Sequence, residues 1–129
     1  MEILEIKDLE KLAKKSVPKM FFEYVNSGSW TETTYNENVS DFQKIKLRQR
    51  VAIDMSNRTL ETKMINQPVS MPVAIAPTGL TGMQRADGEI LAAQAAEEFG
   101  IPYTLSTMSV CSIEACLLYT SDAADDKQC

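Results

Sequence analysis

The sequence has 129 residues, of which 44% are hydrophobic and 24% are charged, and 13 Lys and Arg against 18 Asp and Glu give a formal net charge of −5. This composition is typical of one globular domain. The acidic balance argues against binding to nucleic acid or to an anionic membrane surface, because both need clustered positive charge. No stretch approaches the roughly 20 consecutive apolar residues of a spanning helix, and the acidic first turns do not match a signal peptide.

The three cysteines, Cys111, Cys116 and Cys129, lie near the end of the chain, and the sequence has no histidine. This odd count does not predict a disulfide framework, and a zinc site would need a carboxylate as its fourth ligand. Without histidine the usual base of a Ser or Cys triad is absent. The N-terminus of a helix could activate the Cys111 thiol, but we favour a buried structural cysteine at that position.

Apolar residues at helical spacing predict three helices before residue 43. The first begins with Asp8 as its N-cap, and the second begins at Ser16 with Pro18 in its first turn. Tyr24 belongs to the apolar stripe of the second helix, so we expect it to lie on the buried face. The third helix is expected within residues 31–42.

Alternation of apolar and polar residues begins after these helices. Residues 45–53 follow this pattern and predict an extended segment. A shorter alternation at 60–64 is followed by the turn-forming residues 66–68, which predicts a small hairpin with residues 69–71.

The middle of the chain predicts one βαβ unit of the α/β class. Residues 73–76 form a short apolar run typical of a strand buried on both faces. A loop leads to a helix that ends at Phe99 before Gly100, and a second strand is expected at 104–106. Such strands should be parallel with a right-handed crossover.

Both expected strands end in small polar residues, Thr78-Gly79 and Ser106-Thr107. Ligands bind at the carboxyl edge of parallel sheets, so a flavin or a nucleotide fits this position. Two doubly buried strands need neighbours, and a complete (β/α)8 barrel takes about 250 residues. We therefore expect apolar surface to be exposed on residues 73–76 and on Leu91, Ala95 and Phe99.

Four motifs occur in order: PKMFFEYVNSG at 18–28, LRQR at 47–50, SMPVAIAPTGLTG at 70–82 and GIPYTLSTMSVCSIE at 100–114. Together they resemble the N-terminal part of the FMN-dependent 2-hydroxy-acid dehydrogenase family, and most closely its bacterial respiratory L-lactate dehydrogenase branch. The resemblance implies the N-terminal part of an FMN-binding TIM (β/α)8 barrel with preceding helices, truncated after about two barrel strands, over residues 1–114.

The resemblance also implies roles for five residues. Tyr24 would hydrogen-bond the substrate carboxylate, Pro77, Thr78 and Gly79 would line FMN through their backbone, and Ser106 would contact the flavin ring. Without the resemblance, simpler interpretations are favoured: a core tyrosine, a strand-to-loop turn, and a serine bonded to local backbone. The family's histidine base, carboxylate-binding arginine and flavin-side lysine have no counterpart here, so no catalytic residue is assigned.

The reaction implied by the resemblance is the oxidation of L-lactate, a 2-hydroxy acid, to the 2-oxo acid by hydride transfer to FMN, with electrons passed to quinone or cytochrome. The alternative is a 2-hydroxy-acid oxidase of the glycolate or mandelate type. Gly79 favours the dehydrogenase, since many oxidases of the family carry Ala there. The full-length parent is expected to be a cytoplasmic homo-oligomer, with a peripheral position on the inner face of the cell membrane as a further option.

The last residues, CLLYTSDAADDKQC from Cys116, depart from the family pattern. They resemble the conceptual translation of a transposon-end adapter used in sequencing libraries. We therefore expect residues 115–129 to be a non-native tail and the chain alone to be an inactive fragment. The alternative is a short natural disordered tail.

Overall fold

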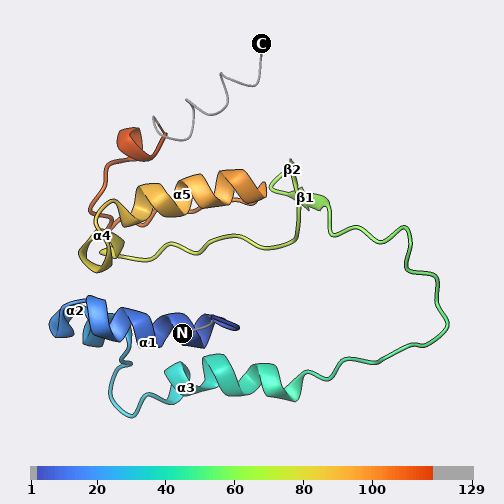
Figure 1. The fold of residues 1–129 in the computed structure, drawn as a ribbon, viewed down its shortest axis with the longest axis horizontal. Coiled ribbons are helices and arrows are strands. Elements are labelled where there is room, and N and C mark those ends of the chain that lie inside the picture. The colour runs from blue at the N-terminus through green and yellow to red at the C-terminus, as the bar shows by residue number, and fades with distance from the viewer. Residues whose placement is uncertain (1–2, 118–129) are drawn as a thin grey trace. The chain divides into compact units, whose positions relative to one another are not determined.

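The computed structural model describes residues 3–117, which belong to two compact units divided between Arg58 and Thr59. The first unit is helical and the second combines helices with short extended segments (Figure 1). Within the described residues no helix is long and apolar enough to cross a membrane. The first unit contains α1 (Ile6–Ser16), α2 (Lys19–Val25), α3 (Thr33–Ser40) and the 3-10 helix η1 (Asp41–Lys44).

The helix α1 begins three residues earlier than the sequence predicted, because Asp8 caps the helix from inside its first turn. Its N-cap is Glu5, and the Asp8 carboxylate accepts hydrogen bonds from the N–H groups of Leu4 at 3.1 Å and Glu5 at 3.4 Å. The Lys11 ammonium, 2.8 Å from Asp8 Oδ1, and these N–H groups hold the pKa of Asp8 below its usual value. The assignment of Asp8 as N-cap was therefore wrong, although its capping role is real.

The helix α2 exposes the face that the sequence predicted to be buried. Its N-cap is Pro18, and its buried residue is Phe22. Tyr24 is 61% exposed. Two helical positions differ by about 200° around the axis, so Phe22 and Tyr24 point in opposite directions. The expected burial of Tyr24 is wrong for this unit.

Residues 45–58 follow the helices without regular secondary structure. Apolar side chains in this segment are exposed, including Leu47 and Val51. A strand needs a partner for its backbone N–H and C=O groups. Among the described residues this segment has no strand partner, so its alternating pattern does not produce a sheet.

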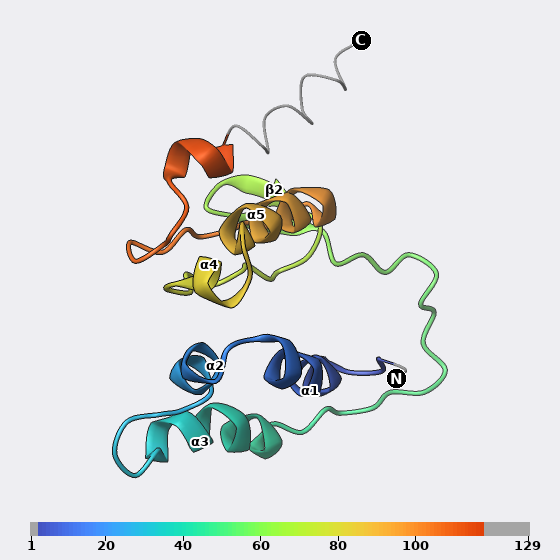
Figure 2. The same cartoon turned by 60° about the vertical axis from the view of Figure 1, so that its left-hand side comes forward.

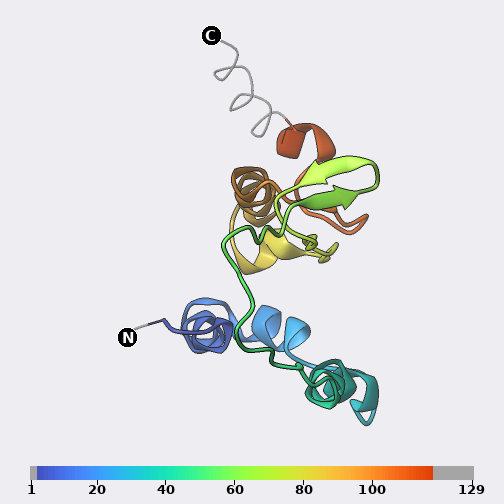
Figure 3. The same cartoon turned by 90° about the vertical axis from the view of Figure 1, so that its right-hand side faces the viewer.

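The second unit starts with an antiparallel hairpin of β1 (Thr62–Met64) and β2 (Gln67–Val69), visible as the two arrows in Figure 3. Its two-residue turn is Ile65-Asn66, and both residues have positive φ, 49° and 62°. This is the geometry of a type I′ turn, which fits the twist of paired strands. The hairpin prediction is confirmed, but the turn lies earlier than predicted because Gln67 and Pro68 belong to β2.

The parallel arrangement of the two expected strands is confirmed. Ile75 and Tyr103 form a parallel bridge, in which the Ile75 N–H donates to Pro102 O at 2.9 Å and the Thr104 N–H donates to Ile75 O at 3.1 Å. The bridge is isolated, so the two segments are not regular strands. Doubly buried parallel strands depend on neighbours on both sides, and the described chain supplies one neighbour for each.

The crossover between these segments contains α4 (Thr81–Gln84), which lies in the predicted loop, and α5 (Gly88–Phe99), which matches the predicted helix. Figure 2 shows α5 with residues 113–117, a further helical turn, in the same unit. The core of this unit consists of Ile90, Ala93 and Cys116, with Tyr103, Leu105, Cys111 and Ala115 packed against it. The opposite face of α5 is open, and Val73, Leu91, Ala95 and Phe99 are exposed as predicted.

Gly100 ends α5 in the left-handed conformation, with φ of 67°. Its N–H donates to Glu97 O, and the Ile101 N–H donates to Ala96 O, both at 2.9 Å. These bonds form a Schellman motif, which favours glycine at this position. We expect Gly100→Ala to lower the free energy of unfolding by about 1 kcal/mol, because a Cβ strains this backbone region.

Urea unfolding followed by circular dichroism measures this effect. Gly100→Asn is the matched variant and should lose less stability, since asparagine tolerates left-handed backbone. An alanine variant as stable as the original chain would contradict a strained left-handed helix end.

Candidate functional site

The five predicted site residues fall in both units. Tyr24 lies in the first unit, and Pro77, Thr78, Gly79 and Ser106 lie in the second. The structure describes each group within its own unit, so the expected meeting of Tyr24 with the other four remains a prediction. The exposure of Tyr24 excludes the interpretation as a core tyrosine within its unit.

The loops after the two parallel segments lie against each other. The Leu80 N–H donates to Met108 O at 2.9 Å, and Leu80 adopts a left-handed φ of 56°. A Cβ added to Gly79 would lie 3.3 Å from Met108 Cβ and 3.8 Å from Ser106 Oγ. The structure therefore brings Gly79 and Ser106 together at the carboxyl edge of the parallel segments.

The Ser106 hydroxyl has a local role at this edge. Its Oγ accepts a hydrogen bond from the Met108 N–H at 3.1 Å, and the Ser109 N–H donates to Ser106 O at 3.1 Å. This is the local backbone bonding expected of a strand-end serine. A hydroxyl that accepts a bond keeps its own hydrogen as a donor, so this role leaves Ser106 able to contact a ligand.

The turn after the first segment is organised by threonine hydroxyls. Thr81 Oγ1 donates to Thr78 O at 3.0 Å, where α4 begins. Gly79 carries no side chain between Thr78 and Leu80, and a tight backbone of this kind permits close approach of a flat ring. The residues at this edge thus suit the backbone lining of a flavin.

A hollow of about 410 Å³ lies beside Ser106 and is lined largely by hydroxyl and apolar side chains. The lining residues are Leu105, Ser106, Thr107, Ser109, Val110, Cys111, Ser112, Ile113 and Glu114. Its one charged lining residue, Glu114, is acidic. A flavin phosphate needs cationic groups or backbone N–H donors. The described lining of this hollow therefore supplies no cationic group for the FMN phosphate.

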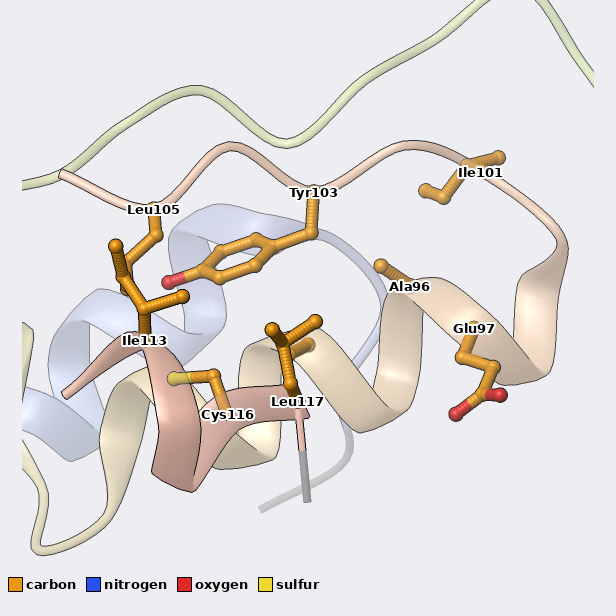
Figure 4. Close-up of a pocket in the computed structure, with 9 residues that line it drawn as sticks. Ala96, Glu97, Ile101, Tyr103, Leu105, Ile113, Cys116 and Leu117 are labelled. Carbon is orange, nitrogen blue, oxygen red and sulfur yellow. The ribbon is translucent and has the colours of Figure 1, made fainter. Parts of the chain in front are cut away.

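A second hollow of about 350 Å³ lies between α5 and residues 113–117 (Figure 4). Tyr103, Leu105, Ile113 and Leu117 are among its lining residues, and Glu97 is the charged one. Binding sites for small polar molecules combine apolar walls with converging polar groups. This hollow has few such groups, so we interpret it as an open part of the core.

Glu89 is the residue that sequence reasoning missed at this site. Its side chain is fully buried at 0% exposure, near the start of α5. Glu89 Oε1 accepts hydrogen bonds from the N–H groups of Gly82 and Val110, both at 3.0 Å. The available signal was an acidic residue in the first turn of a helix, which the helix dipole favours.

The buried carboxylate changes the acidity of the groups around it. Burial raises the pKa of Glu89, but the N–H groups of Val110 and Gly82, with the Cys111 side chain, bring it below its usual value. Burial and then Glu89 raise the pKa of the Cys111 and Cys116 thiols. Both thiols are therefore protonated at neutral pH, which supports a structural Cys111 over an activated one.

The pKa of Glu89 predicts a pH dependence of stability. A carboxyl group whose folded pKa is depressed contributes stability that is present above the unfolded value, about pH 4.3, and is lost as pH falls through the folded value. Glu89→Gln should therefore be about 1–2 kcal/mol less stable than the original chain at pH 7. The difference should shrink below about pH 4.

Urea unfolding at pH 7, 5, 4 and 3 measures this difference. Glu97→Gln, an exposed position on the same helix, is the control and should leave the free energy of unfolding at pH 7 unchanged. A Glu89→Gln penalty that stays constant down to pH 3 would contradict the depressed pKa.

The family model described as FMN-dependent dehydrogenase matches residues 13–126. The chain is 49% identical over 114 residues to an L-lactate dehydrogenase of Acinetobacter baylyi, covering 88% of this chain and 30% of that protein. It is 51% identical over 107 residues to an L-lactate dehydrogenase of Acinetobacter baumannii, covering 83% and 28%. The chain thus spans about 30% of the length of the curated relatives it matches.

Solved structures of related enzymes share this fold. A soluble mutant of the membrane-associated (S)-mandelate dehydrogenase from Pseudomonas putida superimposes with a TM-score of 0.85 and 35% identity, covering 91% of this chain and 34% of that chain. A mandelate oxidase superimposes with a TM-score of 0.82 and 28% identity, covering 88% and 33%. Because the family model covers most of the sequence, the chain belongs to the FMN-dependent dehydrogenase family.

Proposed function

We propose that the full-length protein to which residues 1–114 belong oxidises L-lactate to pyruvate. The observation that carries this proposal is the identity of about 50% to L-lactate dehydrogenases of the FMN-dependent family. The contact between the loops that carry Gly79 and Ser106 supports it, since it provides a backbone-lined edge for the flavin ring.

FMN, when bound, would supply the hydride acceptor. The backbone of Pro77, Thr78 and Gly79 would face the ring, and the Ser106 hydroxyl would donate its remaining hydrogen to it. Tyr24, on the exposed face of α2, would donate its phenolic hydrogen to the substrate carboxylate. A carboxylate in a partly dry pocket needs such donors, because an unpaired charge is costly to desolvate.

The chain of 129 residues is proposed to be inactive by itself. It contains no histidine, whereas oxidation of a 2-hydroxy acid needs a base for the hydroxyl proton. The proposed boundary places a non-native tail at 115–129. Residues 118–129 of that tail lie outside the described residues, and the family match extends to residue 126.

The electron acceptor is proposed to be a quinone or a cytochrome, in a homo-oligomeric protein of the cytoplasm or the inner membrane face. The membrane-associated mandelate dehydrogenase among the similar structures supports the peripheral location. An oxidase acting on glycolate or mandelate is the second candidate, and the likeness to mandelate oxidase favours it. Gly79 supports the dehydrogenase.

The proposed role of Tyr24 predicts the behaviour of Tyr24→Phe in the full-length enzyme. Loss of one hydrogen bond to a charged carboxylate should raise the KM for L-lactate about tenfold, corresponding to about 1.4 kcal/mol. Anaerobic reduction of an artificial dye by L-lactate measures the effect. Tyr35→Phe, another tyrosine of the helical unit, is the matched control and should leave KM unchanged.

Two results would contradict this assignment. Equal effects of the Tyr24 and Tyr35 substitutions would remove the carboxylate role of Tyr24. A full-length enzyme that reduces oxygen faster than a dye or quinone would instead support the oxidase.

The purified 129-residue chain should neither retain FMN nor oxidise L-lactate, because it lacks the histidine base and a cationic phosphate site in the described hollow. Flavin fluorescence after gel filtration measures retention, and dye reduction measures activity. Lactate-dependent dye reduction by this chain would refute the proposal that it is an inactive fragment.

A further inference from the structure

We propose that Glu89 is a positioning residue whose carboxylate ties together the two loops that carry Gly79 and Ser106. We call the two hydrogen bonds from Gly82 and Val110 to Glu89 the tie. This inference rests on the proposed function, in which the tie would hold the two loops of the flavin-facing edge at a fixed separation. Glu89 itself is not placed in contact with FMN or substrate.

The tie joins three separate parts of the second unit. Glu89 belongs to α5, Gly82 to α4 in the first loop, and Val110 to the second loop. Both N–H groups donate to the same atom, Glu89 Oε1, at 3.0 Å. One carboxylate oxygen therefore fixes the distance between loops that are 28 positions apart in sequence, from residue 82 to residue 110.

The tie lies close to the flavin-facing edge. Gly82 follows Gly79 by three positions, and Val110 follows Ser106 by four. Between these pairs, the Leu80 N–H donates to Met108 O at 2.9 Å. The two loops are thus joined by two sets of hydrogen bonds. The bonds to the Glu89 carboxylate lie farther along each loop than the bond between Leu80 and Met108.

Close packing leaves no room for a side chain at position 82 of the first loop. A Cβ added to Gly82 would lie 2.7 Å from Val110 Cβ and 3.1 Å from Glu89 Oε2. The Val110 contact is shorter than real Cβ atoms allow and the Oε2 contact is tighter than usual, so a side chain at position 82 would push the two loops apart. The absence of a side chain at Gly82 and the Glu89 carboxylate together therefore allow the two loops to approach each other.

The carboxylate occupies this position at a free-energy cost. Glu89 is fully buried, and its Oε2 has no hydrogen bond of ordinary geometry among the described residues; the Cys111 thiol that helps to lower its pKa is a weak donor. Burying an incompletely paired charged group is unfavourable, and an apolar side chain would fill the same volume without this cost. An apolar residue at position 89 would not accept the hydrogen bonds from Gly82 and Val110, and these bonds are what the carboxylate contributes.

Amide hydrogen exchange in the 129-residue chain tests the tie directly. Glu89→Met, which keeps the volume and removes the acceptor, should accelerate exchange of the Gly82 and Val110 amides at least tenfold. Glu89→Gln keeps a neutral acceptor in place of the carboxylate and should accelerate these amides less than Glu89→Met does. Glu97→Met, on the exposed part of the same helix, is the matched control and should change neither amide.

A second measurement needs no substitution and applies even where Glu89→Met does not fold. When pH falls through the Glu89 titration, exchange of Gly82 and Val110, corrected for intrinsic rates, should accelerate together. The Leu80 amide, bonded to Met108 O, should not follow them. Unchanged protection in Glu89→Met, or equal acceleration of all three amides in the pH series, would overturn the tie.

The link to the flavin is tested in the full-length holoenzyme. Glu89→Met should weaken FMN binding about tenfold and alter the flavin absorbance spectrum, while Glu89→Gln restores both. Equal FMN affinity and spectrum in the original enzyme and Glu89→Met would overturn the positioning role. A full-length enzyme that binds no FMN would overturn the proposed function instead, and the exchange results would still decide whether the tie exists.

Discussion

The second unit depends on the parallel pairing of Ile75 with Tyr103. Two backbone hydrogen bonds, Ile75 N to Pro102 O and Thr104 N to Ile75 O, place the segments in register. This register directs both following loops to the same edge, where Gly79 meets Ser106. Parallel pairing requires a crossover, and α5 provides it while its Ile90 and Ala93 belong to the same core cluster as Tyr103 of the second segment. The candidate site is therefore a consequence of two backbone bonds and one helix.

Much of this arrangement was predictable because its signals are local. Gly100 at the end of α5 marks a helix boundary, and its left-handed φ of 67° is a conformation that glycine adopts without strain. The apolar run at 73–76 and the small residues after it indicate a strand that ends at a ligand edge. The position of Ser106 beside Gly79 followed from these two features. The family was recognised from four motifs in order, and the match over residues 13–126 confirms it.

The errors came from interactions that a sequence pattern does not specify. Tyr24 and Phe22 are both aromatic, and only packing decides which of them is buried in α2. Asp8 has the residue type of an N-cap, yet it caps from within the helix because Glu5 precedes it at the required spacing. Glu89 is a charged residue near the start of a helix, where a side chain exposed to solvent is the usual expectation. Its burial depends on N–H groups from two distant loops, which no local signal reveals.

Through-hydrogen-bond scalar couplings, measured by NMR on the isotope-labelled 129-residue chain, test the parallel pairing most directly. We predict couplings between Ile75 N and the Pro102 carbonyl carbon, and between Thr104 N and the Ile75 carbonyl carbon. This pair is diagnostic of parallel pairing, because Ile75 bonds to the residues on either side of Tyr103. Reciprocal couplings between Ile75 and Tyr103 themselves would show antiparallel pairing and would contradict the register on which the candidate site depends.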